Sequence, residues 1–469
     1  MNGRTEFHIG SHVELLRDLS VGNVGTGSID AIVVPTINPE RVEDALELAE
    51  RLGCVIVLLC STAPQVEKIR ATHRVPAGAL LIAVPPEYDH RLLDFEQRKF
   101  AKHTDIATKR NIGLLLARLC GWRSIFFLDE DIRGMTPSMI SKAAAALTEY
   151  SVAGFRVLDF PDNSVVCHAH RASGGQQSTF VGGNCIVVDT HPVETYFPDI
   201  YNEDWVFIYD EVAKGSVAVV GELRQLQYDP FSRDAASEEF GDLIAEALVW
   251  ALHDGLNVSS LFFWEDAIDK RSRFIDEVDA RVRRRAEEGR LPGSDRILAR
   301  LAEARARLQE IKPADCLSFY VTWRENVDIW RQRLRSLPTS LTVREAVDLG
   351  APLVPGASAP GTGFSAHPDP WRLPALLVNA SEKTCAGEPS SRIRVIFFRA
   401  LAEPFSRPFT PSESANPGLL ERTPTASAAL ASGRAQASGR LAASVSSPPR
   451  PAADAASATL PLAVVSMRA

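Results

Sequence analysis

The sequence predicts an α/β protein built on a mostly parallel sheet with helices on both faces. Between residues 29 and 265, short apolar and β-branched runs alternate with stretches whose apolar residues recur at helical spacing. The runs are apolar throughout, which is typical of strands buried on both faces. Hydrophobic residues make up 45% of the 469 residues, so the chain can form a substantial core. The alternation favours βαβ units and hence a parallel sheet.

The predicted elements follow one another in a regular order. Residues 29–36 (IDAIVVPT), 54–61 (CVIVLLCS), 78–85 (GALLIAVP) and 124–129 (SIFFLD) are the predicted strands. One helix follows the first strand, and its predicted face is formed by Val42, Ala45, Leu46, Ala49 and Leu52. A second helix precedes the last of these strands, and its predicted face is formed by Ile112, Leu115, Leu116 and Leu119. Ligands of such sheets bind beyond the carboxyl ends of the strands, so we expect the functional site there.

The remaining segments differ in composition from this central part. Residues 1–28 are a lead-in to the predicted main domain, residues 29–265. Residues 266–349 carry interspersed Arg and Glu, which favours a solvated, amphipathic helical extension packed on the main domain. Residues 350–469 are rich in Ala, Ser, Pro, Gly and Thr, so we expect a disordered tail. Within that tail, only RIRVIFFRAL (392–401) is apolar enough to form a short docked element.

Composition and charge argue against several classes of protein. The net charge of −8 argues against a general nucleic-acid binder. No apolar run approaches the roughly 20 residues of a membrane helix, and the first residues lack the apolar core of a secretion signal. The 7 cysteines form no C-x-x-C and several lie in apolar runs, which favours reduced thiols. We therefore expect a cytoplasmic protein without an integral membrane segment.

Asp129, Glu130 and Asp131 directly follow the apolar end of the last predicted strand. A Walker-B pair would need a G-x-x-x-x-G-K-[ST] loop, and the glycine-rich residues 21–28 have no lysine and precede the first strand. An aspartyl phosphotransferase would need Thr or Val where Arg133 stands, on the first strand of its fold. We favour a third chemistry, in which two carboxylates two residues apart hold a divalent cation on a nucleotide diphosphate.

Four other blocks accompany this acidic strand end. In chain order the five blocks read VVPTINP (33–39), KRNIG (109–113), FLDED (127–131), VGGN (181–184) and NEDW (202–205). In this order they resemble the GT-A glycosyltransferases, particularly those of family 2. That family has a strand ending in Pro-Thr with a nearby Asn, an Arg-Asn-x-Gly helix, a DxD strand end, a Gly-Gly-Asn strand and a Glu-Asp-Trp block. The resemblance covers about residues 29–235.

The resemblance implies a GT-A fold and the metal-dependent transfer of a sugar from a nucleotide-diphospho-sugar to an unknown acceptor. It assigns the donor to Pro35, Thr36, Asn38, Arg110 and Asp129. Asp129 and Asp131 are the DxD pair for Mn²⁺ or Mg²⁺, with Asp131 the more direct ligand. The acceptor is assigned to Gly182, Gly183 and Asn184. Asp204 is the implied catalytic base and Glu203 its neighbour, because the attacking hydroxyl must lose a proton to a nearby group.

Structural explanations for these residues remain open. Asp129 and Asp131 also suit a solvated turn, Glu203 and Asp204 an ordinary helix start, Gly182 and Gly183 a tight turn, and Arg110 a surface charge. The pattern CHAH (167–170) suits zinc, but the sequence offers no matching second pair. For the whole chain, the alternative is a non-catalytic GT-A-like protein that binds a nucleotide or a partner.

The sequence differs from the family pattern in three places. The second strand ends in Cys60-Ser61-Thr62, where the family has acidic residues that help to recognise the base. The metal-binding His that follows the Glu-Asp block is missing from ELRQLQYDPF (222–231), where either Asp229 is the substitute or no side chain fills the role. The Gln-Arg-x-x-Arg-Trp motif of processive synthases is absent, which favours a single-transfer enzyme over a polymerase.

Overall fold

The computed structural model describes residues 13–20, 25–84, 100, 104–158, 160, 163–176 and 181–349, and the backbone of Leu377–Asn379. All of these residues belong to the unit Met1–Leu401, and a second unit, Ala402–Ala469, lies outside them. The segments 1–12 and 21–24 of the predicted lead-in, and the predicted docked element at 392–401, also lie outside the described residues.

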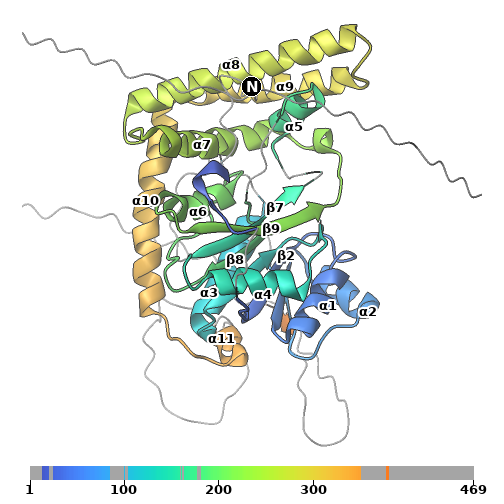
Figure 1. Cartoon of the computed structure of the whole chain (residues 1–469), viewed down its shortest axis with the longest axis vertical. Coiled ribbons are helices and arrows are strands. Elements are labelled where there is room, and N and C mark those ends of the chain that lie inside the picture. Colours follow the sequence, from blue (N-terminus) through green and yellow to red (C-terminus); the bar gives the residue numbers. More distant parts are fainter. Residues whose placement is uncertain are drawn as a thin grey trace, which may run out of the picture. The chain divides into compact units, whose positions relative to one another are not determined.

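A mixed sheet forms the centre of the described part of the chain (Figure 1). Its strands are β1 (Arg17–Asp18), β2 (Ala31–Thr36), β3 (Val55–Cys60), β4 (Leu80–Ala83), β5 (Ser124–Leu128), β6 (Ile132–Arg133), β7 (Val152–Leu158), β8 (Cys185–Asp189), β9 (Val217–Gln225) and β10 (Leu377–Asn379). They are ordered β1-β9-β7-β8-β5-β2-β3-β4-β10, with β6 paired to β9. The pairings of β2 with β3, of β2 with β5 and of β3 with β4 are parallel, as are those of β9 with β7 and β1. The predicted α/β class with a mostly parallel sheet is therefore confirmed.

Strand β8 runs antiparallel to both of its neighbours, β5 and β7. Its first residue, Cys185, is therefore opposite Leu128, the last residue of β5. Likewise, Gln225 at the end of β9 is opposite Ile132 of β6. The loop before β8 and the end of β9 thus lie at the same sheet edge as the three acids that follow β5.

Helices cover both faces of the sheet. In chain order the helical elements are η1 (Val13–Leu15), α1 (Glu43–Leu52), α2 (Ala63–Thr72), α3 (Ile106–Cys120), α4 (Pro137–Ala146), α5 (Val165–Ala172), α6 (Glu203–Ala213), η3 (Pro230–Ser232), α7 (Ala235–Asp254), α8 (Leu261–Glu287), α9 (Ser294–Glu310), α10 (Pro313–Ser336) and α11 (Val343–Leu349). On one face, α1, α2 and α4 pack against Ile32 and Val34 of β2. On the other face, α3 and α6 share a core with Ala31 and Val33. The alternation along β2 is the geometry expected of a strand buried on both sides.

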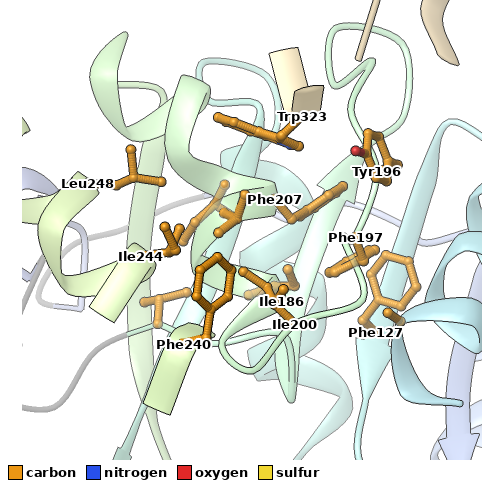
Figure 2. Close-up of a cluster of buried hydrophobic side chains, with 14 of the residues drawn as sticks. Phe127, Ile186, Tyr196, Phe197, Ile200, Phe207, Phe240, Ile244, Leu248 and Trp323 are labelled. Carbon is orange, nitrogen blue, oxygen red and sulfur yellow. The ribbon is translucent and has the colours of Figure 1, made fainter. Parts of the chain in front are cut away.

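Aromatic side chains join the sheet to the helices beyond it (Figure 2). Phe197 stacks on Phe207 of α6 with ring centroids 3.9 Å apart, and Phe127 of β5 meets Phe197 edge-on at 5.3 Å. Phe240 of α7 and Trp323 of α10 belong to the same buried cluster. Because such rings bury large areas, one continuous core extends from the sheet to α10.

The segment predicted as a helical extension consists of α8, α9, α10 and α11. Helix α8 begins at Leu261, and the long helix α7 lies within residues predicted to belong to the sheet domain. The solvated character predicted for these helices is wrong at Arg271, whose side chain is buried against α7. The sequence pattern conceals this burial because the acids that pair with Arg271 lie on a different helix.

Leu377–Asn379 forms β10, which pairs antiparallel with β4. These three residues lie within the predicted tail, where a short apolar run with Val378 offers strand propensity. The rest of the predicted tail, beyond residue 350, lies outside the described residues.

Two global properties of the described residues bear on their environment. No helix among them combines the length and the apolar character needed to cross a membrane. Their cysteines, Cys54, Cys60, Cys120, Cys167, Cys185 and Cys316, are free thiols.

Candidate active site

Hydrogen bonds at the carboxyl edge of the sheet join residues that are far apart in the sequence. The backbone N–H of Asp129, just after β5, donates to the carbonyl of Asn184, just before β8, at 2.9 Å. The backbone N–H of the preceding residue, Gly183, donates to Oδ2 of Asp204 at 2.6 Å. The fold therefore brings the acidic strand end, the Gly-Gly-Asn loop and the start of α6 into direct contact.

Arg110 of α3 lies at the centre of this contact and is 3% exposed. Its Nη2 contacts Oδ1 and Oδ2 of Asp129 at 3.0 and 3.1 Å, and its Nη1 contacts Oε1 of Glu203 at 2.5 Å. Its guanidinium also lies 5.6 Å from the centre of the Phe197 ring. Arg110 is thus buried between two carboxylates. The alternative of a surface charge is therefore wrong.

The charges around Arg110 perturb one another because the site is buried. Burial opposes the charge of Arg110, but Asp129, Glu203 and Asp204 outweigh this effect and raise the pKa of Arg110. Burial raises the pKa of Asp129 to about 8; Arg110 opposes this shift, and the nearby Asp131 and Glu130 add to it. A carboxyl whose pKa is raised in this way marks an edge crowded with acids, and a cation bound there would favour its charged form.

Asp204 and Glu203 begin α6 but occupy different environments. Glu203 is buried and is held by Arg110. Asp204 is only partly buried, and its Oδ1 and Oδ2 accept hydrogen bonds from the backbone N–H groups of Trp205 and Gly183, at 2.9 and 2.6 Å. These two donors fix the orientation of a carboxylate that solvent and substrates can reach. Of the two acids, Asp204 has the access that a catalytic base requires.

Gly183 makes this close approach possible. A Cβ at this position would lie 2.8 Å from Cβ of Asp204 and 2.9 Å from Nη1 of Arg110. Any other residue would therefore displace the acid, the arginine or both. The close approach of Asp204 and Arg110 explains why residue 183 is a glycine.

Glu130, the middle residue of the acidic triplet, holds the loop that follows β2. Its Oε1 accepts hydrogen bonds from the backbone N–H groups of Ile37 and Asn38, at 3.0 and 2.6 Å. Its carbonyl accepts a 2.7 Å hydrogen bond from Nη1 of Arg133. Glu130 therefore positions the loop that carries one of the predicted donor-binding residues, Asn38. In the sequence, the only indication of this role is that residue 130 is acidic.

Asp131 lies at the edge of the same turn, partly exposed, and Nε2 of Gln225 donates to its Oδ2 at 3.0 Å. Gln225 is 8% exposed, and its Oε1 is buried without a hydrogen-bond partner among the described residues. A carboxylate and an amide oxygen are ligands that hard divalent cations accept, together with phosphates and water. Asp131 therefore fits Mn²⁺ or Mg²⁺, and Gln225 would join it if its amide turned to present Oε1, since the amide nitrogen faces Asp131. Asp129 fits less well as a direct ligand because both of its oxygens contact Arg110.

The predicted donor residues of β2 are placed unequally. Pro35 and Thr36 are buried, Asn38 is partly exposed, and the intervening Ile37 is 60% exposed. The sequence interpretation missed Lys109, which is fully buried beside them. Its Nζ donates to the carbonyl of Thr36 at 2.9 Å. A second donation, to Oγ of Ser61 at 2.8 Å, joins Lys109 to the end of β3.

Asp105 completes the surroundings of Lys109, because its Oδ1 lies 3.0 Å from Nζ. The family pattern expects acidic residues at the end of the second strand, where this chain has Ser61. The structure places a lysine against that serine instead. The signal in the sequence was the basic pair at the start of KRNIG, of which only Arg110 was assigned a role.

Other candidate metal ligands have different partners. His168 contacts the hydroxyl of Tyr228 at 2.9 Å, and His170 contacts the carbonyl of Gln176 at 3.1 Å. Asp229, the candidate substitute for the missing His, is exposed, caps η3 and pairs with Arg296 at 2.6 Å. These contacts give each residue a structural role.

Cys167, Asp242 and Glu246 form another group whose ligand atoms lie within 4.8 Å of one another. Arg271 contacts both acids of this group, at 2.5 Å for Asp242 and 3.2 Å for Glu246. A guanidinium therefore already supplies the positive charge that a metal ion would bring.

No protein-family model and no curated protein matches the chain. Among solved structures, the chain is similar to a structure described as mannosyltransferase PcManGT from Pyrobaculum calidifontis in complex with GDP-Man and Mn2+. The TM-score is 0.33 and the sequence identity 14%, and the match covers 67% of this chain and 90% of that chain. A similarity this weak does not define a function, so the residues of the site must do so.

Proposed function

We propose that the chain is a metal-dependent glycosyltransferase of the GT-A type, related to family 2, which transfers a sugar from a nucleotide-diphospho-sugar to an acceptor. The observation that carries this proposal is the contact of Arg110 with Asp129 and Glu203, together with the bond from Gly183 to Asp204. Sequence blocks that were assigned to a donor, an acceptor and a catalytic base thereby form one connected group. We infer a single-transfer enzyme that acts in the cytoplasm.

The acids of the site divide the chemical work. Asp204 removes the proton from the acceptor hydroxyl as this hydroxyl attacks the anomeric carbon. Glu203 takes no part in proton transfer, because Arg110 holds it in a buried pair. This division follows from their environments, since only a reachable carboxylate can contact an acceptor. Gly182, Gly183 and Asn184 border the acceptor beside Asp204.

The donor lies on the other side of the proposed reacting centre. Asp131 and Gln225 would hold Mn²⁺ or Mg²⁺, and Asp129 with Arg110 supports them electrostatically. The metal ion, when bound, neutralises charge on the departing nucleoside diphosphate. The loop at Ile37 and Asn38, held by Glu130, contacts the nucleoside.

One observation favours the alternative of a GT-A-like protein that binds a nucleotide without transferring a sugar. Both oxygens of Asp129 are engaged by Arg110, which leaves Asp131 as the main carboxylate for a metal. A metal ion held by one strong ligand would be placed less firmly on the diphosphate, so a bound nucleotide sugar would be less well prepared for transfer. The two functions share a binding site and differ in turnover.

A panel of nucleotides tests the proposal and separates the two functions. Thermal unfolding is followed with UDP, GDP, ADP and CDP, each with Mn²⁺ and with EDTA. A ligand that binds only the folded state raises the unfolding temperature, so at least one diphosphate should do so with Mn²⁺. Nucleotide sugars that contain the nucleoside diphosphate found to bind are then tested for hydrolysis. Binding without hydrolysis or transfer would favour the alternative, and no binding at all would contradict both.

A further inference from the structure

Asn202, the residue before Glu203 and Asp204, adopts a left-handed backbone conformation with φ 57° and ψ 35°. This conformation is uncommon for residues other than glycine, although asparagine tolerates it best. It persists only where the surroundings hold it. Asn202 therefore has a strained backbone conformation, two residues before the proposed catalytic base Asp204.

Helix α7 supplies the contact that holds this conformation. The side-chain Nδ2 of Asn202 donates to Oδ1 of Asp242 at 2.9 Å. The preceding residue of α7, Gly241, lies directly against the backbone of Tyr201, because a Cβ there would be 2.1 Å from the Tyr201 carbonyl oxygen. Two successive residues of α7 thus contact two successive residues of the chain that leads into α6.

Asp242 is itself fixed by Arg271 of α8. Its Oδ2 accepts a hydrogen bond from Nη2 of Arg271 at 2.5 Å, so its two oxygens are divided between Asn202 and Arg271. Arg271 also contacts Glu239 at 2.8 and 2.9 Å and Glu246 at 3.2 Å. Asp242 and Arg271 are 2% and 3% exposed. A buried, charge-assisted network of this kind holds its members in one geometry.

We propose that Asp242 is a positioning residue of the active site, which holds Asn202 and thereby sets where Asp204 lies. This inference rests on the proposed function for its catalytic meaning. The chain of contacts runs from Arg271 to Asp242, from Asp242 to Asn202, and through the backbone to Asp204 and its donor Gly183. Helices α7 and α8 therefore contribute to the geometry of the site. A displacement of Asp204 by about 1 Å lowers the rate of the catalysed reaction by up to 10²-fold.

The variants separate the side-chain contact from the backbone conformation. Asn202→Gly keeps the left-handed conformation without strain and removes only the amide that contacts Asp242. Ser340→Gly is the matched control, because Ser340 is the other described non-glycine residue with a positive φ, at 64°, and lies in the loop between α10 and α11. The double variant Asn202→Asp with Asp242→Asn exchanges donor and acceptor and leaves the total charge unchanged.

In that double variant, the new amide at 242 donates to the carboxylate at 202 and its oxygen accepts from Arg271. The contact is thereby restored with reversed polarity. The single variant Asn202→Asp, in contrast, sets two carboxylates against each other. The comparison of these two variants shows whether the contact, rather than the residue type, positions the site.

The first measurement does not depend on catalysis. Hydrogen exchange of the Gly183 backbone N–H, followed at residue level in the full chain, reports whether Asp204 still accepts its bond. We expect this amide to exchange about 10-fold faster in Asn202→Gly and in Asn202→Asp, and to regain most of its protection in the double variant. Ser340→Gly should leave it unchanged. Wild-type protection of Gly183 in Asn202→Gly, or no recovery in the double variant, would overturn the proposal.

The second measurement uses single-turnover hydrolysis of the nucleotide sugar found active with the unchanged protein. In Asn202→Gly we expect the rate constant to fall about 10-fold, with the donor affinity and the amplitude unchanged. A purely structural role would lower the amplitude, through loss of folded protein, and leave the rate constant alone. If the unchanged protein turns over no donor, the proposed function fails, and the exchange measurement still decides the positioning role.

Discussion

Oε1 of Glu130 accepts a 2.6 Å hydrogen bond from the backbone N–H of Asn38, which joins the turn after β5 to the loop after β2. The same oxygen holds Ile37 at 3.0 Å. These two loops follow neighbouring parallel strands, so Glu130 braces the sheet edge at which we propose that the donor binds. The middle acid of the triplet thus has a role that differs from the roles of both its neighbours.

Replacement of Glu130 by Ala should loosen the loop at Ile37 and Asn38. Hydrogen bonds to a charged group are worth about 1.5–3 kcal/mol each at most, and water can replace part of this at a partly exposed loop. We expect the free energy of unfolding to fall by about 1–3 kcal/mol. Urea unfolding measures this change. Glu149→Ala, at an exposed glutamate, is the control and should change stability by less than about 0.5 kcal/mol.

Replacement of Gly183 by Ala should disable the site while the protein still folds. The new Cβ would lie 2.8 Å from Cβ of Asp204 and 3.0 Å from Cζ of Arg110, so both side chains must shift. We expect a loss of about 10²-fold in transfer or donor hydrolysis. Gly221→Ala is the matched control, since its Cβ would meet the Phe155 ring at an ordinary 3.5 Å. Equal activity of the two variants would show that the approach at Gly183 is not needed.

Metal binding should depend on Asp131 and Gln225 and not on Asp229. We expect Asp131→Ala to weaken Mn²⁺ binding at least 10-fold, and Gln225→Leu to weaken it to a smaller extent, because an amide oxygen is the weaker ligand. Electron paramagnetic resonance of free Mn²⁺ measures the affinity, with and without the nucleoside diphosphate. Asp229→Ala removes an exposed acid paired with Arg296 and should bind Mn²⁺ like the unchanged protein. If Asp229→Ala weakened Mn²⁺ binding and Asp131→Ala did not, Asp229 rather than Asp131 would be the metal ligand.

The sequence predicted four strands of the sheet, but it did not predict strands such as β7 and β9 or the long helix α7. The strands of residues 29–36, 54–61, 78–85 and 124–129 were recognisable because strands buried on both faces are apolar throughout. Helix α7 was missed because nearly its whole surface is buried, including acids such as Glu239 and Asp242, so it lacks an amphipathic pattern. The burial of these acids is explained only by their partner, Arg271, which lies on another helix.

The candidate site was predicted in its residues but not in its contacts. Motif order indicated that Arg110, Asp129, Gly183 and Asp204 belong together, and these residues are in contact. The sequence could not indicate that Arg110 would bind Glu203 and Asp129 rather than face a ligand, because both arrangements need the same residue types. Gln225 was missed because it belongs to none of the five blocks, and Lys109 was missed because only the second residue of KRNIG was assigned a role.

Stability should decrease as the pH rises from about 5 to about 8, in part through Glu246. Burial raises the pKa of Glu246 to about 8; Arg271 opposes this shift, and Asp242 and Glu239 add to it. In this range the folded state binds more protons than the unfolded state, so the free energy of unfolding falls with pH. The neighbouring Cys167 has a pKa raised well above its ordinary value by burial, and it stays protonated throughout.

Glu246→Gln removes this titration and should flatten the dependence. We expect its urea midpoint to fall less between pH 5.5 and pH 8.5 than that of the unchanged protein. Asp129, whose pKa is also raised by burial, keeps part of the dependence in the variant. Glu265→Gln, at an exposed position of α8, should behave like the unchanged protein. A Glu246→Gln variant with the full original pH dependence would show that Glu246 is ionised throughout this range.

The two acids that begin α6 should respond differently to loss of charge. Glu203→Gln leaves Arg110 with Asp129 alone, in a buried setting, and loss of one partner of a buried pair costs about 3–5 kcal/mol. Asp204→Asn keeps the shape of the side chain and one oxygen that can accept the Gly183 bond, but its amide nitrogen cannot accept the Trp205 bond, and it removes the proton acceptor. We expect Glu203→Gln to lower the unfolding temperature more than Asp204→Asn does, because Asp204 is partly exposed and pairs with no buried charge.

Catalysis should show the opposite order. Asp204→Asn should bind the nucleotide with normal affinity and transfer sugar at least about 10²-fold more slowly, the usual scale for loss of a general base. The measurement is single-turnover transfer, with a nucleotide titration on the same preparation. Donor hydrolysis serves until the acceptor is known, although it is the less sensitive assay because water needs less help from the base. Transfer at the original rate would place the base elsewhere. Loss of nucleotide affinity would instead assign Asp204 to the donor, because a base that contacts only the acceptor has no effect on a nucleotide bound across the anomeric carbon.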